Sequence, residues 1–98
     1  QMSKLPIKAR LVQILSENDR MWDYELINSI YAEYKLSGKE WKWTIRFYLS
    51  ELISAGLFQV TEIRSDDEGI FRNDKVLHQY TLTAQGSSRA KDVDKMGA

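Results

Sequence analysis

Apolar residues recur along the first third of the chain at the three- and four-residue spacing of helices that bury one face. A first helix is expected to start near Pro6, since its missing N–H has no intrahelical partner in a first turn. Asp23 is suited to cap a second helix by accepting from free N–H groups. Between these helices, Met21 and Trp22 predict a very short strand. The apolar positions of the two helices are Ile7, Leu11, Ile14, Leu15, Leu26, Ile27, Ile30 and Tyr34.

A third helix is predicted at about residues 38–54, and the sequence marks both of its ends. Ser37 and Glu40 have the spacing of a capping box, in which each side chain accepts from the backbone N–H of the other residue. The helix is therefore expected to begin close to Gly38. Gly56 suits the left-handed residue that follows many helices. The side expected to be buried carries Trp41, Ile45, Tyr48, Leu49 and Leu52.

Beyond the third helix the period of apolar positions falls to two, which is typical of strands. Two strands are expected to form a hairpin at residues 57–83, joined by a long, largely acidic loop at residues 65–74. After Gly86 the chain has little apolar content, so residues 86–98 form either a short helix or a frayed tail. The residues that share one side of each strand are Phe58 and Val60, and Val76, His78, Tyr80 and Leu82.

Three helices followed by a two-stranded hairpin predict an α+β fold of the winged helix-turn-helix class, with residues 1–98 as a single domain. The 98 residues and 43% apolar content allow one modest core, so dimerisation through residues 1–15 or 86–98 is a natural way to bury more surface. The absence of cysteine excludes disulfides and thiolate metal sites. No stretch is apolar enough to cross a bilayer or to form a signal-peptide core, so a cytoplasmic protein is expected.

The chain has fourteen basic and fourteen acidic residues, and its formal net charge is zero. The signs are unevenly distributed, because basic residues dominate residues 1–20 and the start of the third helix. There Lys39, Lys42 and Arg46 stand against only Glu40. This pattern fits a surface that attracts phosphate, and it fits an ordinary solvated surface equally well.

Three short motifs mark the second helix, the third helix with its end, and the close of the hairpin. They are Tyr24-Glu25-Leu26-Ile27, the run from Thr44-Ile45 through Leu49 and Leu52 to Gly56-Leu57, and Tyr80-Thr81-Leu82-Thr83-Ala84-Gln85-Gly86. Together they resemble the PadR-like group of winged-helix transcriptional regulators, and the spacing also resembles the MarR group. The resemblance covers about residues 8–86. It implies a dimeric repressor with the third helix in the major groove of double-stranded DNA and the hairpin as a wing near the backbone or minor groove.

The outward side of the third helix is the expected DNA-binding surface. Arg46 is the best candidate for bidentate readout of a guanine edge, whereas Lys39 and Lys42 suit phosphates. Thr44 or Ser50 can bond to the DNA backbone or to a base. With one residue from the hairpin loop, the candidate DNA-binding residues are Lys39, Lys42, Trp43, Thr44, Arg46, Phe47, Ser50 and Arg72.

Trp43 and Phe47 lie four residues apart and therefore on one side of this helix. They can contact thymine methyls or sugars, anchor a protein partner, or be covered by the first helix, the C-terminal tail or a second subunit. The three cations of the helix favour a DNA-binding regulator. Zero net charge and the acidic loop favour the alternative, a winged-helix module that binds proteins without binding DNA.

Motifs of catalysis or of cofactor binding are missing from the sequence, which has no P-loop, GxGxxG, GxSxG or HExxH. His78 is the only histidine, and we expect it to be partly buried beside a hydrogen-bond partner, because a lone histidine without cysteines cannot fill a metal site. The acidic loop does not have the spacing of a calcium-binding loop. We therefore predict no enzyme and neither a cofactor nor a metal site.

Overall fold

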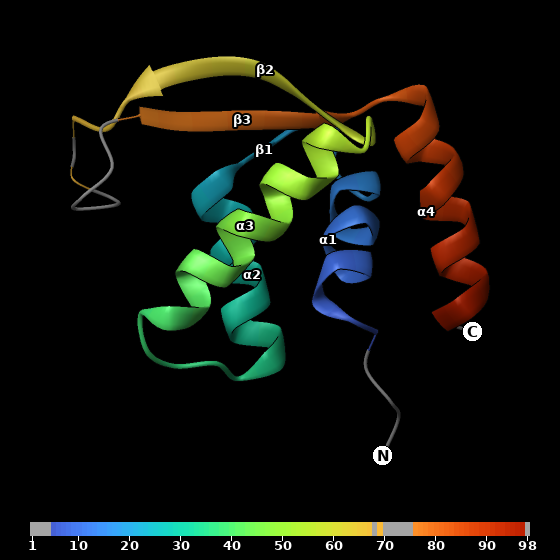
Figure 1. Cartoon of the computed structure of the whole chain (residues 1–98), viewed down its shortest axis with the longest axis horizontal. Coiled ribbons are helices and arrows are strands. Elements are labelled where there is room, and N and C mark those ends of the chain that lie inside the picture. The colour runs from blue at the N-terminus through green and yellow to red at the C-terminus, as the bar shows by residue number, and fades with distance from the viewer. Residues whose placement is uncertain (1–4, 68, 70–75, 98) are drawn as a thin grey trace.

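The computed structural model describes residues 5–67, 69 and 76–97. In this part of the chain the fold is α+β, with four helices and a three-stranded antiparallel sheet in the order β1-β3-β2 (Figure 1). The elements in chain order are α1 (Ile7–Ser16), β1 (Met21–Trp22), α2 (Asp23–Tyr34), α3 (Glu40–Ser54), β2 (Phe58–Ser65), β3 (Val76–Leu82) and α4 (Ala84–Gly97). None of these helices combines the length and the apolar content needed to cross a bilayer.

The helices α1, α2 and α3 gather on one side of the sheet, and α4 stands beside α1 (Figure 1). α1 and α4 run in opposite directions, so the start of α1 and the end of α4 lie at the end of the molecule away from the sheet. On the side away from α4, β2 and β3 extend past α2 and α3. The hairpin formed by β2 and β3 therefore projects from the helical part.

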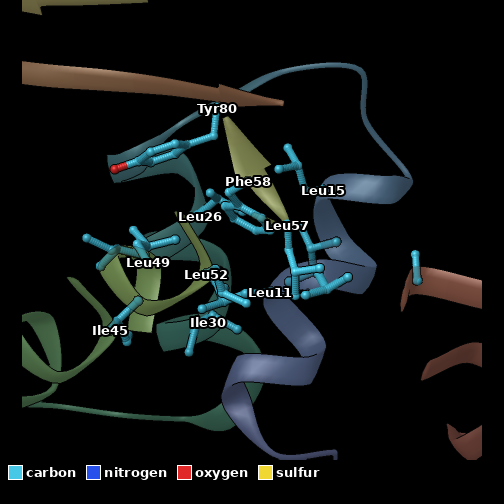
Figure 2. Packing of buried hydrophobic residues seen from close by; sticks show 14 of the residues in the cluster. Leu11, Leu15, Leu26, Ile30, Ile45, Leu49, Leu52, Leu57, Phe58 and Tyr80 are labelled. Carbon is cyan, nitrogen blue, oxygen red and sulfur yellow. The ribbon is translucent and has the colours of Figure 1, made fainter. Parts of the chain in front are cut away.

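The core lies between the three helices and the sheet, where Figure 2 shows side chains from α1, α2, α3 and the start of β2 meeting. Burial of a leucine or isoleucine side chain contributes about 1.5–3 kcal/mol, so these contacts dominate the stability of the fold. The predicted apolar sides of α1 and α2 are confirmed apart from Ile7 and Tyr34, which are half-buried. The fully buried residues with the largest side chains are Leu11, Leu15, Leu26, Ile27, Ile30, Ile45, Leu49 and Val12.

The predicted end of α3 is confirmed. Gly56 has φ +80°, and its N–H donates to the carbonyl of Ile53 at 3.0 Å. The N–H of Leu57 donates to the carbonyl of Leu52, also at 3.0 Å. These two bonds form a Schellman motif, which satisfies carbonyls at the helix end and turns the chain into β2.

The predicted start of α3 is wrong, because the helix begins at Glu40 and no side chain caps it. Gly38 adopts a left-handed φ of +91°, which prevents the helix from continuing back through it. The Tyr31 hydroxyl donates to the Gly38 carbonyl at 2.6 Å and fixes this segment beside α2. The Ser37 capping box therefore does not form.

The start of α2 also differs from the prediction. The residue that precedes the helix is Trp22, and its N–H donates to Glu25 Oε1 at 2.8 Å. Asp23 is instead the first helical residue, and its side chain is buried. The predicted strand at Met21 and Trp22 is confirmed as β1, which pairs with β3.

β2 and β3 pair in antiparallel register, from Phe58 opposite Leu82 to Ser65 opposite Val76. A bulge leaves Thr61 as the extra residue in β2, since Val60 pairs with Tyr80 and Glu62 with Gln79. On the predicted inner side of β3 only Tyr80 is buried, whereas His78 and Leu82 are half-buried and Val76 is exposed. The sequence prediction missed Leu77, which is buried and belongs to the same core cluster as Tyr80.

The chain after the hairpin forms α4, so the frayed-tail alternative is wrong for residues 84–97. Ala90 and Val93 are buried. The Thr83 hydroxyl accepts from the N–H of Gly86 at 3.0 Å and donates to the carbonyl of Gly56 at 2.6 Å. Thr83 therefore caps α4 and joins it to the turn that ends α3.

Candidate functional site

The outer face of α3, made of Lys39, Trp43, Phe47 and Ser50, is exposed to solvent. Trp43 is 57% exposed and Phe47 is 60% exposed. Neither α1 nor α4 covers them, so that alternative is wrong for the single chain. The opposite side of α3 is buried through Ile45, Leu49 and Leu52. We call Trp43 and Phe47 the aromatic pair.

Trp41 does not lie in the buried stripe of α3, where the sequence pattern places it, because it is 38% exposed. The reason is its position in the first turn of a helix that starts only at Glu40. Figure 1 shows that this turn lies at the end of α3 farthest from the sheet, where fewer elements pack against it.

Arg46 does not project fully outward as predicted, because it is half-buried. Its guanidinium carbon lies 5.6 Å from the centre of the Trp43 ring. Its positive charge lowers the pKa values of Asp23 and Tyr80, so it acts on the buried polar groups between α2 and β3. The charge of Arg46 is thus one of the influences that oppose the burial-driven rise in the pKa of Asp23.

The other polar candidates also differ in their availability. Lys42 and Thr44 are half-buried. The Thr44 hydroxyl donates to the carbonyl of Glu40 at 3.2 Å, within its own helix. Arg72 lies outside the described residues. Among the candidates in the described part, those that stay exposed are Lys39, Trp43, Phe47 and Ser50.

Behind this face lies a polar cluster centred on Asp23, which is only 2% exposed. The Asp23 carboxylate accepts from the backbone N–H of Tyr24 at 2.8 Å and from that of His78 at 3.1 Å. The Nδ1 atom of His78 lies 3.7 Å from the same carboxylate, and its ring stacks on Tyr80 with centres 6.3 Å apart. The expectation that His78 is partly buried is confirmed. Sequence reasoning missed Asp23 as the link between α2 and β3.

Burial raises the pKa of the Asp23 carboxyl above its ordinary value, and the hydrogen bonds from His78 and Tyr24 oppose this rise, as do the charges of His78 and Arg46. Burial, followed by the charge of Asp23, raises the pKa of the Tyr80 phenol to about 12, while Arg46 lowers it. The charged form of Asp23 is therefore disfavoured by its removal from water. The hydrogen bonds of Asp23 join the start of α2 to β3, which indicates a structural role.

Two exposed cations near the candidate surface were not predicted as site residues. Lys35 ends α2 with φ +56° in the connection to α3. Arg64 lies on the projecting part of β2, with its guanidinium carbon 4.8 Å from the centre of the Trp22 ring. The sequence signal for Lys35 was its place just before the third helix, in the same basic stretch as Lys39.

An apolar groove of about 350 Å³ lies between α1, α4 and the end of α3, where Val12, Leu52 and Val93 contribute to its walls. Lys8 at this groove forms an ion pair with Glu51 at 3.0 Å. Within residues 5–67, 69 and 76–97, no three acidic or histidine side chains are grouped so that they could hold a metal ion.

Comparison with known protein families gave no match, and neither did comparison with curated proteins. Interpretation of the outer face of α3 therefore depends on its geometry and charge. That face combines an exposed aromatic pair with lysines at the start of the helix. Helix N-termini attract anions, and lysines add to this effect.

Proposed function

We propose that the chain is a winged-helix domain that binds double-stranded DNA and acts as a cytoplasmic regulator of transcription, as the resemblance to the PadR-like group implies. The observation that carries the proposal is the open outer face of α3, since the other side of the helix is packed in the core. A hairpin that projects beyond the helices supports it, because a wing needs such a position (Figure 1).

In this proposal α3 enters the major groove, and Lys39 and Lys42 contact phosphates at its start. Arg46 is half-buried, so base readout depends on the exposed residues. The zero net charge and the acidic residues Asp66 and Asp67 at the end of β2 oppose binding to any DNA without regard to sequence. Non-specific affinity is therefore expected to be low at physiological salt and measurable only at low salt.

A homodimer is part of the proposal, because two copies of α3 one helical turn apart would read a palindromic site. The two candidate dimer segments, residues 7–15 of α1 and residues 86–97 of α4, lie side by side in the chain's fold. A dimer contact through either segment would therefore use the same region of the surface. Sedimentation velocity tests this part separately, since the single chain has a mass of 11.4 kDa. A dimer at micromolar concentration supports it, and a monomer at all concentrations refutes it.

DNA binding is tested by a fluorescence titration of random-sequence duplex DNA at several salt concentrations between about 50 and 200 mM. We expect affinity to fall steeply with salt. In the double variant Lys39→Ala, Lys42→Ala, binding weakens and the slope of log affinity against log salt becomes shallower by about two. The control is Arg20→Ala, which removes a positive charge from an exposed position in the turn between α1 and β1, outside α3 and outside the candidate dimer contacts. This control is expected to bind like the wild type.

A second candidate function is binding to another protein through the aromatic pair, and the exposure of Trp43 and Phe47 favours it. Large aromatics are frequent anchors of protein interfaces. Absence of DNA binding at the lowest salt, or identical binding by wild type and the Lys39, Lys42 variant, would support this candidate and contradict the DNA proposal.

A further inference from the structure

The polar side chains of α3 offer few groups for reading bases. The Thr44 hydroxyl bonds to its own helix, and Arg46 is half-buried near Asp23. Glu51 is held by Lys8 at 3.0 Å. Hydrogen-bonded readout needs donors and acceptors that reach into the groove. On the outer face of α3 the largest exposed side chains are instead apolar.

The aromatic pair has a geometry that suits stacked base pairs. Trp43 and Phe47 are separated by about 40° around the helix and by about 6 Å along it, given 100° and 1.5 Å per residue. Two base steps span about 6.8 Å of the DNA axis. Arg46 lies against the Trp43 ring at 5.6 Å, which restricts the orientation of that ring. The pair can therefore contact two positions in one groove.

The edges of base pairs in the major groove present donors and acceptors, and the only apolar group among them is the 5-methyl group of thymine. Exposed aromatic rings that enter this groove gain most where such methyl groups lie. Lys39 immediately precedes α3 and Lys42 lies in its first turn, and both carry charge that complements phosphate. This complementarity favours duplex DNA as the partner of the pair over an apolar protein surface.

We infer that the aromatic pair gives the domain a preference for thymine over bases without a 5-methyl group, through contact of Trp43 and Phe47 with thymine methyl groups. This inference rests on the proposed DNA-binding function and adds the base feature that is recognised. Burial of one methyl group changes affinity about fourfold, so two contacts change it about fifteenfold.

The test compares duplexes that differ only in methyl groups. One pair is an alternating A·T duplex and the same duplex with deoxyuridine in place of thymidine. The second pair is an alternating G·C duplex and the same duplex with 5-methylcytosine. For the full chain at low salt, we expect the methyl-bearing duplex of each pair to bind about 4–15-fold more tightly.

Two variants separate methyl contact from general DNA binding. In Trp43→Ala, Phe47→Ala, the affinity ratio within each pair is expected to fall to about one. In Lys39→Ala, Lys42→Ala, all four duplexes bind more weakly while the ratio is kept. Because both rings are exposed, the aromatic variant should unfold at the wild-type temperature. If the aromatic variant unfolds at a lower temperature, the single variant Phe47→Ser replaces it in the test, and it must lower the affinity ratio within each pair of duplexes.

The outcomes distinguish the inference from the function on which it rests. Absence of binding to every duplex refutes the proposed function and the inference together. Binding with equal affinity for thymine and uracil duplexes refutes only the inference, as does a ratio that survives in the aromatic variant. Loss of the ratio in that variant, with duplex binding retained, supports both.

Discussion

Removal of the Asp23 carboxylate is expected to destabilise the domain strongly, although the group is buried at a cost. In Asp23→Ala, the backbone N–H groups of Tyr24 and His78 lose their acceptor, which now lies at 2.8 and 3.1 Å. Leaving a buried donor unsatisfied costs about 1–3 kcal/mol. Arg46 also loses a neighbouring negative charge. Part of this loss is offset, because the variant no longer has to bury a carboxylate away from water. The raised pKa of Asp23 shows that this burial is unfavourable for the charged form.

We expect a net loss of about 2–3 kcal/mol at neutral pH, which corresponds to a fall in Tm of about 8–24 °C for a domain of this size. Urea unfolding monitored by circular dichroism and tryptophan fluorescence measures the free energy directly. Asp92→Ala is the matched control, because Asp92 is an exposed acid on α4. Surface substitutions of this kind stay within about 0.5 kcal/mol.

The pH dependence provides an independent check on the same cluster. Because the pKa of Asp23 is raised on folding, the folded state binds its proton more tightly than the unfolded state. The contribution of the Asp23 carboxyl to the free energy of unfolding is therefore greatest at a pH below the ordinary carboxyl pKa. This contribution is lost as pH rises through the raised pKa of the folded state. The stability difference between wild type and Asp23→Ala should widen as pH falls from 7 toward 4.

Both chains should carry His78→Gln in this experiment, because histidines change charge between about pH 5 and 8. The substitution keeps the backbone N–H that Asp23 accepts. A stability difference that narrows on acidification would show that folding lowers the pKa of Asp23. A loss below about 0.5 kcal/mol at neutral pH would show that the carboxylate does not link α2 to β3.

Two further predictions concern packing and ionisation. Gly86→Ala should destabilise the domain by about 2–3 kcal/mol in urea unfolding, because an added Cβ would clash with the Leu57 carbonyl and displace α4. Gly69→Ala is the milder comparison, since no atom lies close to the position of its Cβ. Equal losses of stability in the two variants would contradict the clash as the cause. In an alkaline absorbance titration, Tyr80 should ionise with a pKa of about 12, because its phenol is buried. Tyr80→Phe should remove the ionisation step near pH 12, and persistence of that step would refute the assignment.

Features that depend on neighbouring residues could be predicted from the sequence. The helical spacing in α1 and α2 determines which side of each helix is apolar, and the core follows from it. Gly56 ends α3 because glycine adopts positive φ without strain, and the motif involves only residues 52–57. The short strand β1 was also found, since a turn-rich segment isolates Met21 and Trp22.

Features that depend on distant residues could not be predicted. α3 begins at Glu40 and not near Gly38, because Gly38 has φ +91°, and the Gly38 carbonyl accepts from the Tyr31 hydroxyl of α2. The buried position of Asp23 depends on His78, 55 residues further along the chain. α4 has a polar sequence, and it is held by contacts with α1, which include Gln13 Nε2 to Asp94 Oδ1 at 2.7 Å.

The candidate site shows the same division. Helical periodicity places Trp43 and Phe47 on one side of α3, and their exposure matches one of the options left open by the sequence. Periodicity predicts that Arg46 faces outward, whereas its side chain is half-buried and its charge acts on Asp23 in another helix. Trp41 was misplaced because the pattern extends one turn beyond the region where other helices pack.

The bulge at Thr61 determines which residue of β2 pairs with His78. Without the extra residue, regular pairing from Phe58 onward would put Glu62 opposite His78, whose N–H and ring already contact the Asp23 carboxylate. The observed register puts Ile63 there and moves Glu62 to the opposite surface of the ribbon. One inserted residue thus keeps Glu62 away from the strand position opposite His78, the partner of the Asp23 carboxylate.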